Sequence, residues 1–161
     1  DGLRELNETP GWRKLLGITK PDKNQKDIEL ILRLFSLFER WTEYEKPMLR
    51  WLNHAMNLER SFDSARAKRF VKRFPEVVAL VNQAIDRPFR PKRVINAAVL
   101  EGVMVTLLEH PEVSSDGLED RYNTLLQDGN FSSAIRGATT DTLLLKDRLI
   151  TAKNILVDGA K

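Results

Sequence analysis

The stretch VINAAVLEGVMVTLL, residues 94–108, is apolar around almost its whole helical circumference. Its polar side chains are Asn96, Glu101 and Thr106, with Gly102 between them. A helix that is apolar on all sides is stable only when other elements surround it. The stretch therefore predicts a central, buried helix near residues 94–109, and an all-α fold built around it.

Two polar residues of this helix, Asn96 and Glu101, need partners if they are buried, because an unpartnered polar group inside a protein costs several kcal/mol. One interpretation is a hydrogen-bonded network that fixes the helix register. The other is a pair of side chains that faces a ligand.

Residues 27–41 form the next most apolar segment, with two neighbouring stripes at helical spacing. A helix with so wide an apolar arc must be contacted on more than one side. The stripes are Ile28, Ile31, Leu32, Phe35 and Phe38, and beside them Leu30, Leu34, Leu37 and Trp41.

Proline, glycine and capping residues mark where the other helices begin and end. Thr9-Pro10 is typical of a helix start, and Gly17 of its end. Pro47 is expected to open a further helix. Ser61 or Asp63 is expected to cap the one after it.

Pro75 lies inside a continuous helical pattern that runs from Phe70 to Ile85. Either one helix kinks at Pro75, or a new helix begins there. Further along, Ser115-Asp116-x-x-Glu119 has the pattern of a capping box, and Thr139-Thr140-Asp141 that of a last helix start. We predict a compact all-α bundle of six to eight helices.

The composition excludes several protein classes. The chain has 161 residues, of which 42% are hydrophobic and 30% charged, enough apolar material for a core. It has no apolar run long enough to span a bilayer and no basic-then-apolar leader. It has no cysteine, and its histidines are His54 and His110. We therefore expect no metal site, no cofactor and no catalytic residue in this segment, no membrane partner, and a cytoplasmic location. Because the chain opens on Asp1, we expect residues 1–161 to be one helical domain excised from a longer chain.

The positive charge is concentrated in the middle of the chain. Residues 61–100 carry nine basic and three acidic side chains, whereas residues 101–161 carry six and ten. Such a cluster can neutralise phosphates, or it can be a solvated face that balances the acidic last third. The candidate nucleic-acid-binding residues are Arg66, Lys68, Arg69, Lys72, Arg73, Arg87, Arg90, Lys92 and Arg93.

Base stacking needs exposed rings between basic residues. Phe70 and Phe74 share a helical face with Val77 and read as core. Phe89, which lies between Pro88 and Arg90, is the better stacking candidate.

Three stretches together resemble the helical part of the bacterial family called domain of unknown function 262. They are residues 12–18, residues 27–38 with 44–53, and residues 95–102 with Thr140 and 147–150. The resemblance implies a ParB-like nucleotidase and nuclease domain ahead of this region, in restriction or phage-defence proteins. The Asp-Gly-Gln-Gln-Arg type motif of that domain is absent here, so no catalytic residue is carried over. Residues 60–93, which hold the basic cluster, do not align with the family pattern.

Two functions follow as expectations. The first is a non-catalytic helical module of a restriction or phage-defence protein, which binds DNA or docks the missing nuclease domain through residues 61–93. The alternative is a structural protein-interaction domain, whose apolar arc on residues 27–41 meets a missing domain or a second copy.

Overall fold

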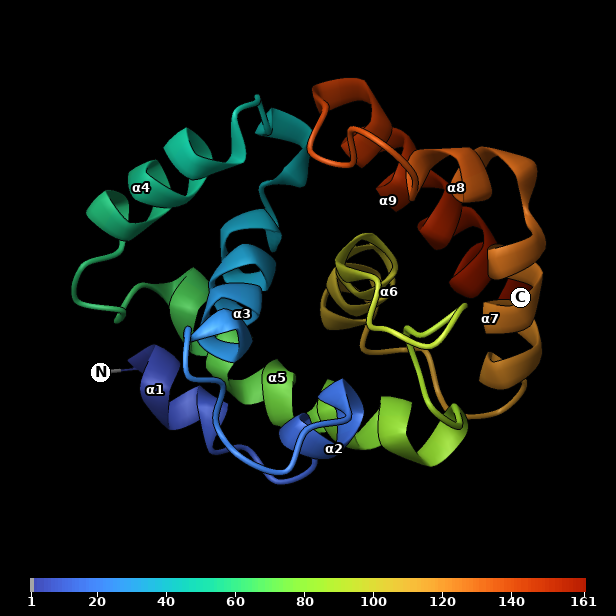
Figure 1. Ribbon diagram of the computed structural model, residues 1–161, viewed down its shortest axis with the longest axis horizontal. Helices are drawn as coiled ribbons and strands as arrows, with labels where there is room; N and C mark the ends of the chain where they lie inside the picture. The colour runs from blue at the N-terminus through green and yellow to red at the C-terminus, as the bar shows by residue number, and fades with distance from the viewer. Residues whose placement is uncertain (1) are drawn as a thin grey trace.

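The computed structural model describes residues 2–161, and these form an all-helical fold without strands. The helices surround a central apolar one, as Figure 1 shows. Their bounds are α1 Gly2–Asn7, α2 Trp12–Leu16, α3 Lys26–Leu37, α4 Met48–Leu58, α5 Ala65–Ala84, α6 Ala97–Glu109, α7 Leu118–Gln127, α8 Gly129–Ala134 and α9 Thr142–Leu156, with two short 3-10 turns at Trp41–Glu43 and Asp158–Ala160.

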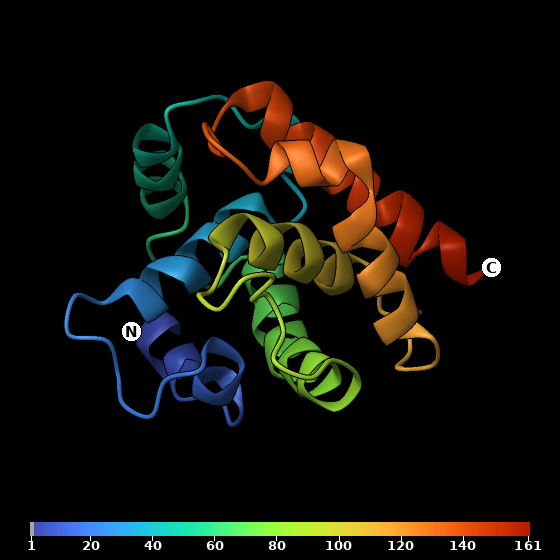
Figure 2. The same ribbon diagram turned by 45° about the vertical axis from the view of Figure 1, so that its right-hand side comes forward.

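The central helix is α6, and it confirms the prediction from residues 94–108. Every residue from Ala98 to Leu108 is buried. Helices α3, α5 and α9 pack against it. Figure 2 shows α6 lying between α3 on one side and the α7–α9 layer on the other. The buried apolar side chains form one continuous cluster from Leu6 to Val157.

The wide apolar arc of residues 27–41 is covered within this chain. Helix α3 ends at Leu37, and Trp41 belongs to the following 3-10 turn. Helices α1, α4 and α6 pack on α3, and Phe70 of α5 meets Phe35 edge-on at 5.2 Å. The buried part of the arc is therefore packed within this chain, whereas four of its side chains stay half-exposed: Ile28, Leu30, Leu32 and Trp41.

Helix α5 continues through Pro75, which resolves the alternative left open by the sequence. The helix tolerates proline here because Pro75 lies on its exposed side, while Phe74, Val77 and Val78 keep the buried side intact. The cost is one missing N–H donor in the helical ladder.

Several predicted helix starts were wrong, although the helices exist. Gly11 and Gly117, both left-handed, precede α2 and α7, and neither start has a side-chain cap. Ser64, rather than Ser61 or Asp63, caps α5. Thr9 and Ser115 do not cap through their side chains. Instead their backbone carbonyls accept hydrogen bonds from the N–H groups of Trp12 and Leu118, in turns that lead into the helices. Asp141 and Gly17 were predicted correctly as the start of α9 and the end of α2.

The count of helices exceeds the expected six to eight because α1 carried no strong sequence signal. Its six residues include one buried apolar side chain, Leu6. Within residues 2–161, none of the helices has the length and apolar character needed to cross a membrane.

Candidate nucleic-acid interface

The nine basic residues of the middle segment separate into two sets in the structure. Four arginines are engaged by other parts of the chain. The remaining five side chains are exposed and make no hydrogen bond or ion pair with another residue of the described range 2–161; they are Lys68, Lys72, Arg87, Lys92 and Arg93.

Arg66 is buried and serves the end of α3. Its Nη1 donates to the carbonyls of Phe35 at 2.6 Å and Phe38 at 2.7 Å, and its Nε contacts Glu59. The guanidinium also lies 4.3 Å from the centre of the Phe35 ring. Burial lowers the pKa of Arg66 below its ordinary value, and nearby Arg40 acts in the same direction. Its side chain is committed to the interior and presents no surface to a phosphate.

Two further arginines also hold helix ends. Arg73 Nη2 donates to the Leu107 carbonyl at 2.8 Å, at the end of α6. Arg90 Nη2 donates to the Leu15 carbonyl at 3.2 Å, at the end of α2. Unpaired carbonyls and the negative end of the helix dipole attract cations at these places. The basic cluster is thus partly a set of helix caps.

Arg69 is exposed but paired. Its guanidinium contacts the Glu39 carboxylate with three N···O distances of 3.0, 3.0 and 2.6 Å. The acidic partners of the cluster are therefore Glu39, Glu59 and Glu76, all from the first half of the chain, rather than the acidic last third.

Lys92 and Arg93 lie on a groove of about 930 Å³ beside the first turn of α6. Its other wall is the segment between α8 and α9, which brings in a third basic side chain, Arg136. None of the residues that line this groove is acidic. The lining residues are Pro91, Lys92, Arg93, Val94, Ile95, Asn96, Ala97, Ala98, Leu126, Ser132, Ile135, Arg136, Gly137 and Thr139.

The loop that carries Lys92 and Arg93 is fixed at both ends. The backbone N–H of Asn96 donates to the Phe89 carbonyl at 2.7 Å. The Phe89 N–H in turn donates to the Tyr122 hydroxyl of α7 at 2.9 Å. Because the loop is closed on itself and pinned to α7, its charged tip stays beside α6.

Asn96 joins the two walls of the groove. Its Oδ1 accepts hydrogen bonds from the N–H groups of Ala98 and Val99, so it is the N-cap of α6. Its Nδ2 donates to the Ile135 carbonyl at 3.4 Å. The positive end of the α6 dipole thus faces the same groove as the three basic side chains.

Arg136 was not among the residues predicted from the sequence. It is one basic residue in the acidic last third, and only the packing of α8 and α9 places it opposite Lys92 and Arg93. Its Nη2 donates to Ser132 Oγ at 3.0 Å, which leaves its other donors for a ligand. In the sequence, the one feature that marks Arg136 is its place in a segment rich in serine, glycine and threonine, residues 132–140.

The other three free cations lie elsewhere. Lys68 and Lys72 line a different groove, between α1 and α5. Arg87 is exposed in the turn after α5 and lines neither groove.

Phe89, the predicted stacking ring, is fully buried against Tyr122, so this prediction was wrong. The backbone carbonyl and N–H of Phe89 are hydrogen-bonded to Asn96 and Tyr122, and this places the ring in the interior instead of on the surface.

Glu101 belongs to a buried network, as the first of its two interpretations predicts. Its carboxylate contacts Arg33 of α3 and Arg148 of α9, each at 3.0 Å. Arg148 also donates to the carbonyls of Ala134 and Thr139. Burial lowers the pKa of Arg148 despite the neighbouring Glu101. The network ties three helices together rather than facing a ligand.

Within residues 2–161 no group of three or more acidic or histidine side chains is arranged to hold a metal ion.

Comparison with known proteins finds no family model, no curated protein and no solved structure that matches this chain.

Proposed function

We propose that this domain is a non-catalytic nucleic-acid-binding module that contacts the phosphate backbone of DNA through the Lys92–Arg93–Arg136 groove. The observation that carries the proposal is the groove itself, whose lining includes three basic side chains and no carboxylate. The α6 dipole adds positive potential at the same place.

The chemistry suits backbone contact rather than base reading. Contacts from arginine and lysine to phosphate oxygens position a protein on DNA, but they do not distinguish one base sequence from another. The neighbouring Asn96, Ser132 and Thr139 offer further polar contacts. The module would therefore assist the DNA binding of a larger protein, in the cytoplasm where DNA is accessible.

The setting in a restriction or phage-defence protein, with a nucleotidase or nuclease domain that this module serves, stays a prediction from the resemblance. The non-catalytic part of the proposal rests on the sequence, in which no catalytic motif is recognised. His54 is exposed on α4, and the ring of His110 contacts Glu112 at 2.9 Å, also near the surface.

The test is fluorescence anisotropy of labelled duplex DNA with the whole chain at 50 and 200 mM salt. With about three phosphate contacts, the affinity should fall roughly 40-fold between these salt concentrations. The variant Lys92→Gln/Arg93→Gln should weaken binding at least 10-fold at low salt and flatten the salt dependence.

A matched control removes the same charge elsewhere. Lys68→Gln/Lys72→Gln should leave DNA binding within about 2-fold of the wild type. Equal loss in both variants would mean that only net charge matters, and the groove would not be the site. Absence of binding at 50 mM salt would overturn the proposal.

A further inference from the structure

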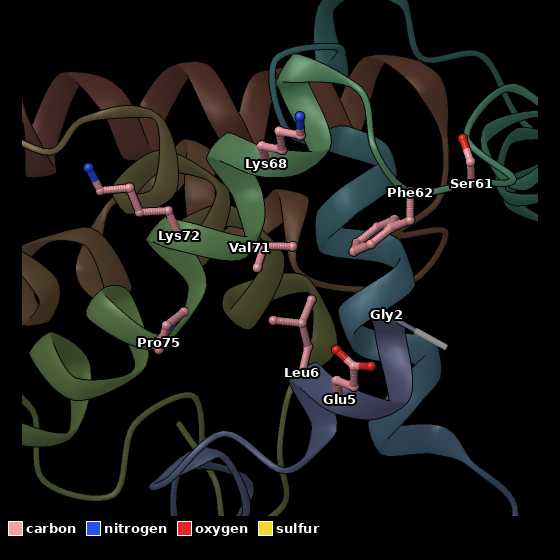
Figure 3. A pocket seen from close by; sticks show the side chains of 9 residues that line it. All are labelled: Gly2, Glu5, Leu6, Ser61, Phe62, Lys68, Val71, Lys72 and Pro75. Atoms are coloured by element: carbon pink, nitrogen blue, oxygen red, sulfur yellow. The ribbon is translucent and has the colours of Figure 1, made fainter.

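A second groove, of about 630 Å³, lies between α1 and the outer side of α5. Figure 3 shows it from close by, with Leu6 and Phe62 facing Val71 across it. It is separate from the proposed DNA groove, since the two share no lining residue. Its walls come from α1, from the Ser61–Phe62 turn, and from one face of α5.

The floor of this groove is apolar. Val71 is an exposed apolar side chain, with 41% of its surface accessible. Phe62 is half-buried and meets Phe35 of the core edge-on at 4.7 Å. Gly2 packs so closely on the Phe62 ring that a side chain there would collide with it. A partner would therefore meet an apolar surface at Phe62 and Val71.

Pro75 removes one backbone hydrogen bond from the same wall. In an α-helix the N–H of residue 75 would donate to the carbonyl of Val71. Proline has no N–H, so this bond cannot form. Both residues line the groove.

The charge at the rim is asymmetric. Lys68 and Lys72 lie one turn apart on α5, and neither side chain has a partner within the described residues. Like charges at this spacing repel each other and disfavour the helix. Glu5 lies on the opposite wall, on α1. The α5 side of the groove is thus positive, and a ligand with carboxylates on that side would relieve the repulsion.

We propose that this groove is a docking site for an acidic, amphipathic peptide segment of a partner protein. Its apolar side chains would cover Phe62 and Val71, beside which Leu6 is already buried. Its carboxylates would pair with Lys68 and Lys72. A groove of this size buries a few side chains, so the affinity belongs to the weak, transient class. We expect dissociation constants in the micromolar range.

The test is selection of a random 12-residue display library on the whole chain, with counter-selection on Lys68→Gln/Lys72→Gln. Enriched peptides should carry Asp or Glu beside Leu or Phe. The consensus peptide, labelled for anisotropy, should bind the lysine variant at least 10-fold more weakly. Val71→Ser, an exposed change, should weaken binding about 5-fold without shifting the thermal midpoint.

The control is Lys92→Gln/Arg93→Gln, which should bind the peptide like the wild type. The proposal is overturned if no enriched peptide distinguishes the wild type from the lysine variant, or if enriched peptides lack acidic residues. Displacement of the peptide by duplex DNA would show that the surface binds nucleic acid instead. Because each groove has its own charge-matched variant, failure of one proposal leaves the other testable.

Discussion

Arg66, Arg73 and Arg90 donate hydrogen bonds to carbonyls at the ends of α3, α6 and α2. Helix ends leave four carbonyls without intrahelical donors, and a buried end needs a substitute. A guanidinium suits this role because it carries five donors in a fixed plane. At the residue scale, a basic side chain in this segment is therefore either a cap or a surface charge, and its neighbours determine which.

We predict that Arg66→Met destabilises the domain by about 3 kcal/mol, because it leaves the Phe35 and Phe38 carbonyls and Glu59 without their donor. Equilibrium urea unfolding measures the loss. Lys68→Met, two residues along on the exposed side of the same helix turn, should change stability by less than about 0.5 kcal/mol. Similar effects for the two variants would contradict the capping role.

Glu109 should make the stability depend on pH. It lines a small cavity with Glu39, Trp41 and Lys153 at the end of α6. Burial raises the pKa of Glu109 from 4.5 to about 7, helped by the Glu39 charge, whereas Trp41, the Glu39 backbone N–H and Lys153 act in the opposite direction. Between pH 4.5 and 7 the unfolded chain loses this proton first, so stability falls as pH rises.

Glu109→Gln removes this ionisation. The variant should be more stable than the wild type at pH 8, by about 2 kcal/mol after allowance for solvent screening. The advantage should shrink steadily as the pH approaches 4.5. Chemical unfolding of both proteins at pH 5, 6, 7 and 8 provides the comparison, and a difference that does not vary with pH would refute the account.

At the scale of single elements, α5 shows how a helix accommodates an unfavourable interior proline, Pro75. Its buried face, which includes Phe70, Phe74 and Val77, is uninterrupted across Pro75. Burial of one such side chain contributes about 1.5–3 kcal/mol, so several of them outweigh the roughly 3 kcal/mol of an interior proline. Tertiary packing keeps one helix where local preference alone allows two.

We predict that Pro75→Ala stabilises the domain by about 1–2 kcal/mol. The change restores the bond to the Val71 carbonyl, offset in part by the greater freedom of the unfolded chain. The urea midpoint should rise. The reverse change one turn on, Ala79→Pro, also at an exposed position, should cost about 3 kcal/mol. A lower midpoint for Pro75→Ala would mean that proline is required by the local geometry.

For the whole molecule, two features join the N-terminal and C-terminal halves. One is the continuous apolar cluster from Leu6 to Val157. The other is the network in which Glu101 of α6 bridges Arg33 of α3 and Arg148 of α9. Buried charges of this kind favour one arrangement of helices, because any other leaves a charge unpaired.

We therefore predict that the chain unfolds as a single cooperative domain. The tryptophans, at positions 12, 41 and 51, report on the first third of the chain, whereas far-UV circular dichroism reports on all helices. The urea transitions followed by the two signals should coincide. A separate, earlier transition in either signal would divide the chain into two folding units.

The helical class, the central helix and most helix positions could be predicted from the sequence, because burial of apolar residues at helical spacing depends mainly on the pattern itself. The stretch 94–108 is apolar all round, and it can only lie inside. Helix starts were less predictable. At the start of α5 Ser64 caps the helix in place of the expected Ser61 or Asp63, and at α7 the Leu118 N–H donates to the Ser115 backbone carbonyl rather than to a side chain.

The candidate site depended on tertiary contacts. The concentration of positive charge in residues 61–100 is visible in the sequence, but its division into caps and free cations is not. Arg66 and Lys68 are two residues apart, yet the first is buried on backbone carbonyls and the second faces solvent. Arg136 joins Lys92 and Arg93 from more than forty positions away along the chain. Charges act through distance in space, and that distance follows from how the helices pack rather than from residue order.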